Sequence, residues 1–138
     1  GPAALKAVLA ADTVLASGGL TKSDKEIIKL DISEAAGCDY CVAAHSHLAK
    51  LVGLAPEVLK QIRDGQPTGD AQRDTLVAFV DKLARTSGTI SHKDFVAIKA
   101  AGYSDAQLVD ISLAFATTVF TNVFNRINDT EIDFPAVA

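Results

Sequence analysis

Apolar residues in this chain recur every three to four positions, and glycines separate one such run from the next. Leu5, Val8 and Leu9 begin the pattern, in a run that closes at Gly18-Gly19. This spacing collects apolar side chains on one face of a helix, and glycine just beyond the last apolar residue is a typical helix end. No segment alternates apolar and polar residues as a half-buried strand would. The sequence therefore predicts an all-α fold, a bundle of about six to seven helices.

Capping residues and glycines place the individual helices. Thr21 with Asp24 forms an approximate capping box at the start of the second expected helix, and Gly37 ends or interrupts that helix. Ser104 with Gln107 is a capping box for the last and longest helix. The expected helices end near residues 18, 37, 53, 62, 88, 101 and 128.

The composition is that of a globular domain with an ordinary core. Of 138 residues, 49% are hydrophobic and 22% are charged, which argues against disorder. We expect one domain over residues 3–138, with Gly1-Pro2 a remnant of tag removal. The net charge of −4 without a basic cluster predicts no nucleic-acid partner. No apolar run approaches the length of about 18 residues that a membrane span needs, and no signal peptide is visible, so the expected location is the cytoplasm.

The last helix is apolar on more than one side. Val109 and Val123 widen its face beyond a single stripe, and residues 132–137 form a further apolar segment without helical spacing. Such surfaces need more cover than one small layer provides, so we expect a homo-oligomer. The expected buried side of this helix carries Leu108, Ile111, Phe115, Val119 and Phe120.

Both cysteines of the chain lie close together, with a histidine beyond them. Cys38 and Cys41 are three residues apart and His45 follows four residues later, so the three side chains share one helix face. Two sulfurs that can bridge, one helical turn from an imidazole, indicate a redox or nucleophilic site. Glu34 would share this face only if the helix continued through Gly37, so we expect a structural or supporting role for it.

The residues alone leave the order of the two thiols open. A free thiol has a pKa of about 8.5 and ionises at neutral pH only where its surroundings stabilise the thiolate. Cys38 would receive that help from the helix N-terminus, whereas Cys41 would receive it from His45. Two other kinds of site use the same residues. One is structural zinc bound with a further histidine, which three ligands on one helix disfavour. The other is a helical assembly protein whose cysteines are not catalytic.

Three segments resemble the alkylhydroperoxidase AhpD-like proteins of the carboxymuconolactone decarboxylase superfamily. Residues 38–45 match the CxxCxxxH signature, and Glu26 stands twelve residues before the first cysteine, as a glutamate does in that family. Residues 101–111 and 124–128 resemble the family's later helix-turn-helix segment and its characteristic end. The resemblance covers about residues 20 to 134 and implies the family's helical bundle.

The resemblance also implies roles and partners. Cys41 would attack a hydroperoxide, Cys38 would resolve the product to a disulfide, and His45 with Glu26 would relay protons. An external dithiol, lipoyl-type or thioredoxin-like, would reduce the disulfide. Family members commonly form trimers or hexamers, and we expect no cofactor and no metal.

One position departs from the family pattern. AhpD itself has a histidine just before the second cysteine, where this chain has Tyr40. The departure favours general thiol–disulfide exchange over full peroxidase activity, whereas the presence of both cysteines argues against decarboxylation. We expect Tyr40 to form a pocket wall and His47, which faces elsewhere on the helix, to meet an interface or solvent.

Overall fold

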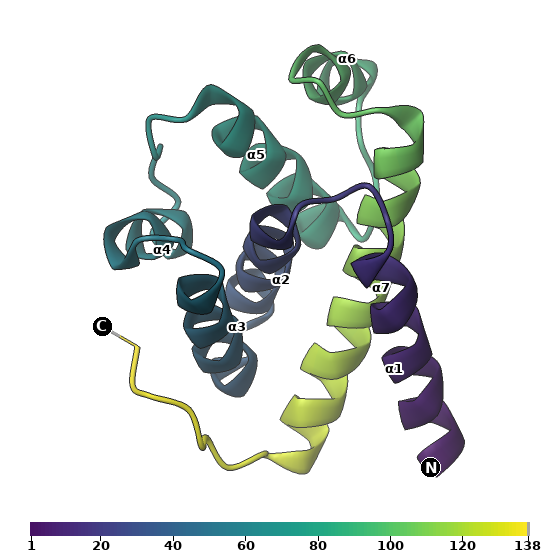
Figure 1. Cartoon of the computed structure of the whole chain (residues 1–138), viewed down its shortest axis with the longest axis vertical. Helices are drawn as coiled ribbons and strands as arrows, with labels where there is room; N and C mark the ends of the chain where they lie inside the picture. Colours follow the sequence, from purple (N-terminus) through teal and green to yellow (C-terminus); the bar gives the residue numbers. More distant parts are fainter. Residues whose placement is uncertain (138) are drawn as a thin grey trace.

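The computed structural model describes residues 1–137, which contain seven α-helices and no β-strand (Figure 1). The predicted all-α class is confirmed, and the helix ends fall within two residues of those expected from glycines and caps. The helices are α1 (Pro2–Ala16), α2 (Lys22–Ala36), α3 (Asp39–Leu51), α4 (Pro56–Arg63), α5 (Ala71–Thr86), α6 (His92–Ala100) and α7 (Asp105–Asn128).

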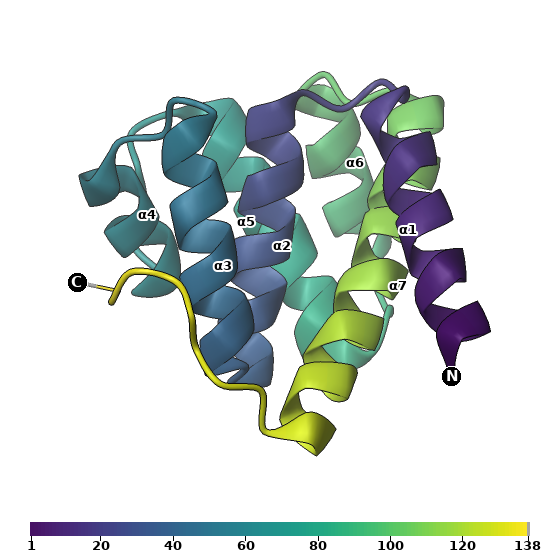
Figure 2. The same cartoon turned by 60° about the horizontal axis from the view of Figure 1, so that its bottom comes forward.

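Helix α2 is the centre of the bundle. It packs against α3, α4, α5 and α7, whereas α1 packs mainly along α7 (Figures 1 and 2). Its buried residues therefore face in several directions rather than along one stripe. This central position lets α2 contribute side chains to two separate cavities.

Local hydrogen bonds explain where the helices begin and end. The Thr21 hydroxyl accepts from the Asp24 amide at the start of α2, and Gly37 ends that helix at a φ of 69°, a left-handed conformation that favours glycine. The expected capping box of α7 forms in full between Ser104 and Gln107. Because these signals are local, they could be located in the sequence.

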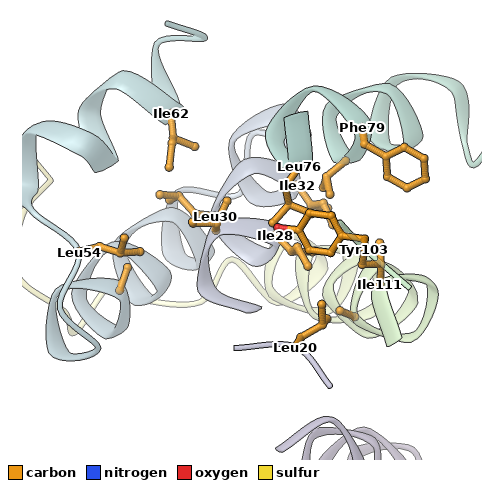
Figure 3. Close-up of a cluster of buried hydrophobic side chains, with 14 of the residues drawn as sticks. Leu20, Ile28, Leu30, Ile32, Leu54, Ile62, Leu76, Phe79, Tyr103 and Ile111 are labelled. Atoms are coloured by element: carbon orange, nitrogen blue, oxygen red, sulfur yellow. The ribbon is translucent and has the colours of Figure 1, made fainter. Parts of the chain in front are cut away.

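The apolar core gathers around α2, with contributions from the helices beside it (Figure 3). Burial of this apolar surface is the main force that holds the helices together. The labelled core residues are Leu20, Ile28, Leu30, Ile32, Leu54, Ile62, Leu76, Phe79, Tyr103 and Ile111.

The buried face of α7 differs from the expected one. Ile111 is buried as predicted, but Val119 is exposed, and Leu108, Phe115 and Phe120 are only half-buried. The inner face of the second half is instead polar, and the Thr117 and Thr118 hydroxyls on it donate to the Ala114 carbonyl of the preceding turn. Asn122 donates to the Ser33 hydroxyl at 3.0 Å. The buried residues of α7 are Ile111, Ala114, Thr117, Thr118 and Asn122.

The outward face of α7 is long and apolar. Ile127 is 82% exposed, and Val109 and Val123 are also largely uncovered. By length and composition α7 could cross a membrane, with a mean hydropathy of 1.3 over a window of 18 residues of which 22% is buried. The sequence analysis expected no apolar run of the length that a membrane span needs, and α7 contradicts that expectation in its length and composition. Residues 1–137 of one chain leave this face exposed.

The segment after α7 turns back across α3 (Figure 2). The Phe134 ring lies 5.6 Å from the Tyr40 ring and 5.9 Å from the His47 ring, centroid to centroid. His47 thus meets the C-terminal tail of its own chain.

Candidate active site

The junction of α2 and α3 places the two sulfurs. Gly37 reverses the chain direction, and Cys38 caps α3, its sulfur accepting a hydrogen bond from the Cys41 amide at 3.3 Å. Cys38 and Cys41 form a disulfide with their Cα atoms 5.2 Å apart. Both residues are nearly inaccessible, at 2% and 3% exposed. The predicted CxxC pair is therefore joined, at the start of a helix.

His45 is held by a carboxylate from the neighbouring helix. Its Nδ1 lies 3.0 Å from Glu26 Oε2, and the two side chains are 15% and 13% exposed. When Nδ1–H donates to this carboxylate, the imidazole has a fixed orientation and its Nε2 can accept or release a proton. The structure thus brings together Glu26 and His45, whose partnership the sequence implied only through the family resemblance.

Cys41 and His45 line the same cavity. Its volume is about 180 Å³, and its walls come from α1, α2, α3 and α7. Lys29 also lines it, with its ammonium 3.6 Å from the Asp12 carboxylate. A small substrate in this cavity would meet the Cys41 sulfur, the imidazole and a cation together. The sequence analysis did not identify Lys29, because no local spacing connects it to the cysteines.

Asn125 of α7 reaches the Cys41 sulfur directly. Its Nδ2 donates to Sγ at 3.6 Å and to the Thr121 carbonyl at 2.9 Å. The Thr130 hydroxyl donates to Oδ1 at 2.8 Å and itself accepts from Asn128 Nδ2 at 3.0 Å. These bonds orient the amide so that its N–H groups, not its oxygen, face the sulfur. The sequence analysis did not connect Asn125 with the cysteines, because the two are 84 positions apart and no local spacing links them.

Cys38 lines a different cavity from Cys41. A second cavity of about 240 Å³ is lined by Cys38, Asp39 and Tyr40 from the start of α3, and by Arg126 and Thr130. The Arg126 guanidinium also donates to the Ala36 carbonyl, which ties the end of α7 to the end of α2. Of the two cavities, only the first is lined by Cys41 and only the second by Cys38.

Glu34 and Tyr40 are close to the cysteines in sequence but differ in whether they line the disulfide cavities. Glu34 is exposed and lies away from the disulfide cavities, because α2 ends before Gly37 as expected. Tyr40 lines both disulfide cavities, as expected for a wall residue. Burial and the nearby Asp133 carboxylate raise the pKa of Tyr40, so its hydroxyl stays protonated at neutral pH.

Comparison with known proteins places the chain among related folds. Residues 2–66 match the carboxymuconolactone decarboxylase family. A protein of unknown function from Agrobacterium tumefaciens, described as a candidate antioxidant defence protein AhpD, superposes with a TM-score of 0.87 at 25% identity, over 99% of this chain and 93% of that one. No curated protein matches the sequence.

Two further solved structures share the fold. A peroxidase-related protein with an alkylhydroperoxidase AhpD core, from Ralstonia eutropha JMP134, gives a TM-score of 0.82 at 26% identity, over 91% of this chain and 68% of that one. The debrominase Bmp8, solved with 2,3,4-tribromopyrrole, gives 0.84 at 19% identity, over 96% and 72%. At that identity the debrominase supports a common fold only.

Proposed function

Because this chain belongs to the carboxymuconolactone decarboxylase family in its AhpD-like form, we propose that it is a thiol-dependent peroxidase acting through Cys38 and Cys41. One observation carries the proposal: Cys41 is bonded to Cys38 and lines the same cavity as His45, which Glu26 holds at 3.0 Å. A disulfide beside an oriented imidazole is the expected product of peroxide reduction by a dithiol.

The first step of the proposed cycle takes place in the Cys41 cavity. His45 accepts the Cys41 proton, and the thiolate attacks the terminal oxygen of a hydroperoxide. The O–O bond breaks, leaving a sulfenic acid on Cys41 and an alkoxide that takes the proton from His45 and departs as alcohol. Asn125 donates to the sulfur, and Glu26 stabilises the imidazolium between the two transfers.

The second and third steps use Cys38. Its thiol condenses with the sulfenic acid, which releases water and forms the disulfide. An external dithiol, lipoyl-type or thioredoxin-like, then attacks the disulfide; it is oxidised as the two cysteines are reduced. The separate cavity on the Cys38 side supports an approach of this reductant away from the peroxide cavity.

Mass spectrometry of the reduced protein tests the proposal. One equivalent of an organic hydroperoxide should remove both thiols and lower the mass by two hydrogens. Cys38→Ser should stop at a sulfenic acid that dimedone traps on Cys41, whereas Cys41→Ser should not form one. Two unreacted thiols in the wild-type protein after prolonged exposure would contradict peroxidase activity. A sulfenic acid on Cys38 in the Cys41→Ser variant would reverse the order.

A general thiol–disulfide oxidoreductase is the second candidate, and Tyr40 favours it. The raised pKa of Tyr40 makes its hydroxyl a weak proton donor in the place where AhpD has a histidine. Turnover of a disulfide substrate together with slow reaction of the thiols with hydroperoxide would favour this activity. A helical assembly protein without catalysis predicts that neither reaction depends on His45.

We further propose that the chain forms a homo-oligomer, a trimer or hexamer, through α1 and α7. Leu9 on α1 and Ile127 on α7 are exposed apolar residues on the two helices that pack along each other. Sedimentation velocity of the purified protein should give a mass several times that of one chain. A monomer that requires detergent would instead point to lipid as the cover of α7.

A further inference from the structure

A third, larger cavity lies on the other side of α2 from the disulfide. Its volume is about 560 Å³, and α2, α4, α5 and the loop after α4 line it. None of Cys38, Cys41, His45 and Glu26 lines it. Its walls combine five carboxylates and two guanidinium groups with apolar side chains such as Ile62 and Val77.

One carboxylate oxygen in this cavity, Oδ2 of Asp31, has no hydrogen-bond partner among residues 1–137. Asp31 itself is only 6% exposed. A buried polar atom without a partner costs free energy, so it usually indicates a missing ligand or water. Because Asp31 lines the cavity, a molecule entering there can supply the missing donor.

The other acids of the cavity are largely committed to partners of their own. Asp64 pairs with Lys60 at 2.7 Å, and Asp81 pairs with Arg85 at 2.8 Å. Asp74 accepts from the Thr68 amide and hydroxyl. The five carboxylates outnumber the guanidinium groups of Arg63 and Arg85, so the cavity is negative overall. Asp31 is its buried acid, and Glu34 lies at the exposed edge.

We propose that this cavity binds a small aliphatic ammonium ion, whose N–H groups donate to Asp31 while its carbon chain contacts the apolar wall. A metal ion fits less well, because no group of three or more His, Cys, Asp or Glu side chains among the described residues is placed to hold one. An ammonium ion needs only one carboxylate and brings three donors.

The electrostatics of Asp31 agree with this assignment. Burial first, and then the negative charge of Asp81, raise the pKa of Asp31 to about 7, against the opposing charge of Arg85. A bound cation would favour the ionised form and lower this pKa, so binding should release a proton near neutral pH. The charged groups that line the cavity around Asp31 are Glu34 from α2, Arg63 and Asp64 from the end of α4, and Asp74, Asp81 and Arg85 from α5.

Titration with 1,4-diaminobutane tests the proposal, with 1,4-butanediol as the neutral control of equal length. In NMR spectra of the labelled wild-type protein, the diamine should shift the amide signals of Ala35 and Gly65, and the diol should not. Asp31→Asn should weaken diamine binding about tenfold or more. Asp105→Asn, the same charge change at an 87% exposed site on α7, should leave binding unchanged.

A measurement on the wild-type protein keeps the test independent of folding of the variant. The carboxyl carbon signal of Asp31 should titrate at lower pH with the diamine present than with the diol. No shift of that titration, equal binding by Asp31→Asn, or equal effects of diamine and diol would each overturn the proposal. Because the readout does not involve the cysteines, it is independent of peroxidase activity.

Discussion

Two acids of helix α2, Glu26 and Asp31, lie beside different neighbouring helices and have opposite surroundings. Glu26 is paired at 3.0 Å with His45, on the side of the disulfide. Asp31 is more deeply buried, on the side of α4 and α5, and its Oδ2 has no partner. A paired acid orients the group it holds, whereas an unpaired one destabilises the fold unless something binds. The disulfide site therefore has its polar groups paired, whereas the cavity at Asp31 lacks a hydrogen-bond donor for Oδ2.

Loss of the imidazole should have the largest effect on the paired side. His45→Gln removes the group proposed to accept and return the proton, so peroxide-driven disulfide formation should slow about 10³-fold at pH 7. Stopped-flow measurement of the reduced variant against the wild type checks this. If the rates agree within a factor of about two, His45 is not the base.

The next largest effect should come from Asp31, through stability rather than rate. The native state binds this proton up to about pH 7, whereas the unfolded carboxyl loses it near its ordinary value of 3.8. The free energy of unfolding should therefore fall as pH rises between those values, by about 4 kcal/mol for this group. The loss is complete above pH 7.

Asp31→Asn isolates that contribution. The stability of the variant relative to the wild type should grow from pH 4 to pH 8, as urea unfolding at several pH values would measure. Asp105→Asn provides the baseline, because an exposed acid should give a difference that changes little with pH. A flat difference for Asp31→Asn would show that its carboxylate already has a partner in solution.

Removing the Glu26 carboxylate should cost less than removing the imidazole. Glu26→Gln retains a group that can accept a hydrogen bond from Nδ1 but loses its charge, so the peroxide reaction should slow about tenfold. The exposed variant Glu57→Gln on α4 is the matched control. Equal rates for the two variants would reduce Glu26 to a structural residue and weaken the contrast with Asp31.

The smallest of these effects should follow from the amide that faces the sulfur. Asn125→Ala removes a donor to Cys41, so the rate of iodoacetamide alkylation at pH 7 should fall about threefold in the reduced protein. Thr130→Val should act in the same direction, because it removes the hydrogen bond to Oδ1 that helps keep the amide N–H groups toward the sulfur. Thr75→Val, on α5 outside the site, should change nothing. An unchanged alkylation rate in Asn125→Ala would contradict its contact with the thiolate.

Local signals made much of the fold and the centre of the site predictable. Helix caps such as Thr21 and terminators such as Gly37 act over a few residues, and so does the spacing that groups Cys38, Cys41 and His45. Glu26 lies 19 residues before His45 and pairs with it across two helices. No periodicity predicts such a pair, so the family resemblance was needed to find it.

Contacts between distant segments could not be predicted. Asn125 meets a sulfur 84 positions earlier, and its chemistry is visible only once α7 lies against α3. The prediction of the buried face of α7 was partly wrong for a related reason. Asn122 is buried because Ser33 supplies a hydrogen bond from another helix, whereas Val119 is left outside. An apolar stripe alone therefore does not identify the inner face of a helix that also carries polar contacts.

The Cys38 sulfur has a consequence for how this chain could diverge. That one atom both begins α3, by accepting the Cys41 amide, and forms half of the disulfide. Serine is a favoured residue at this helix position, so Cys38→Ser would end the dithiol chemistry while preserving the helix start. Descendants of such a chain could thus lose the proposed redox catalysis in a single step and keep the scaffold for other uses.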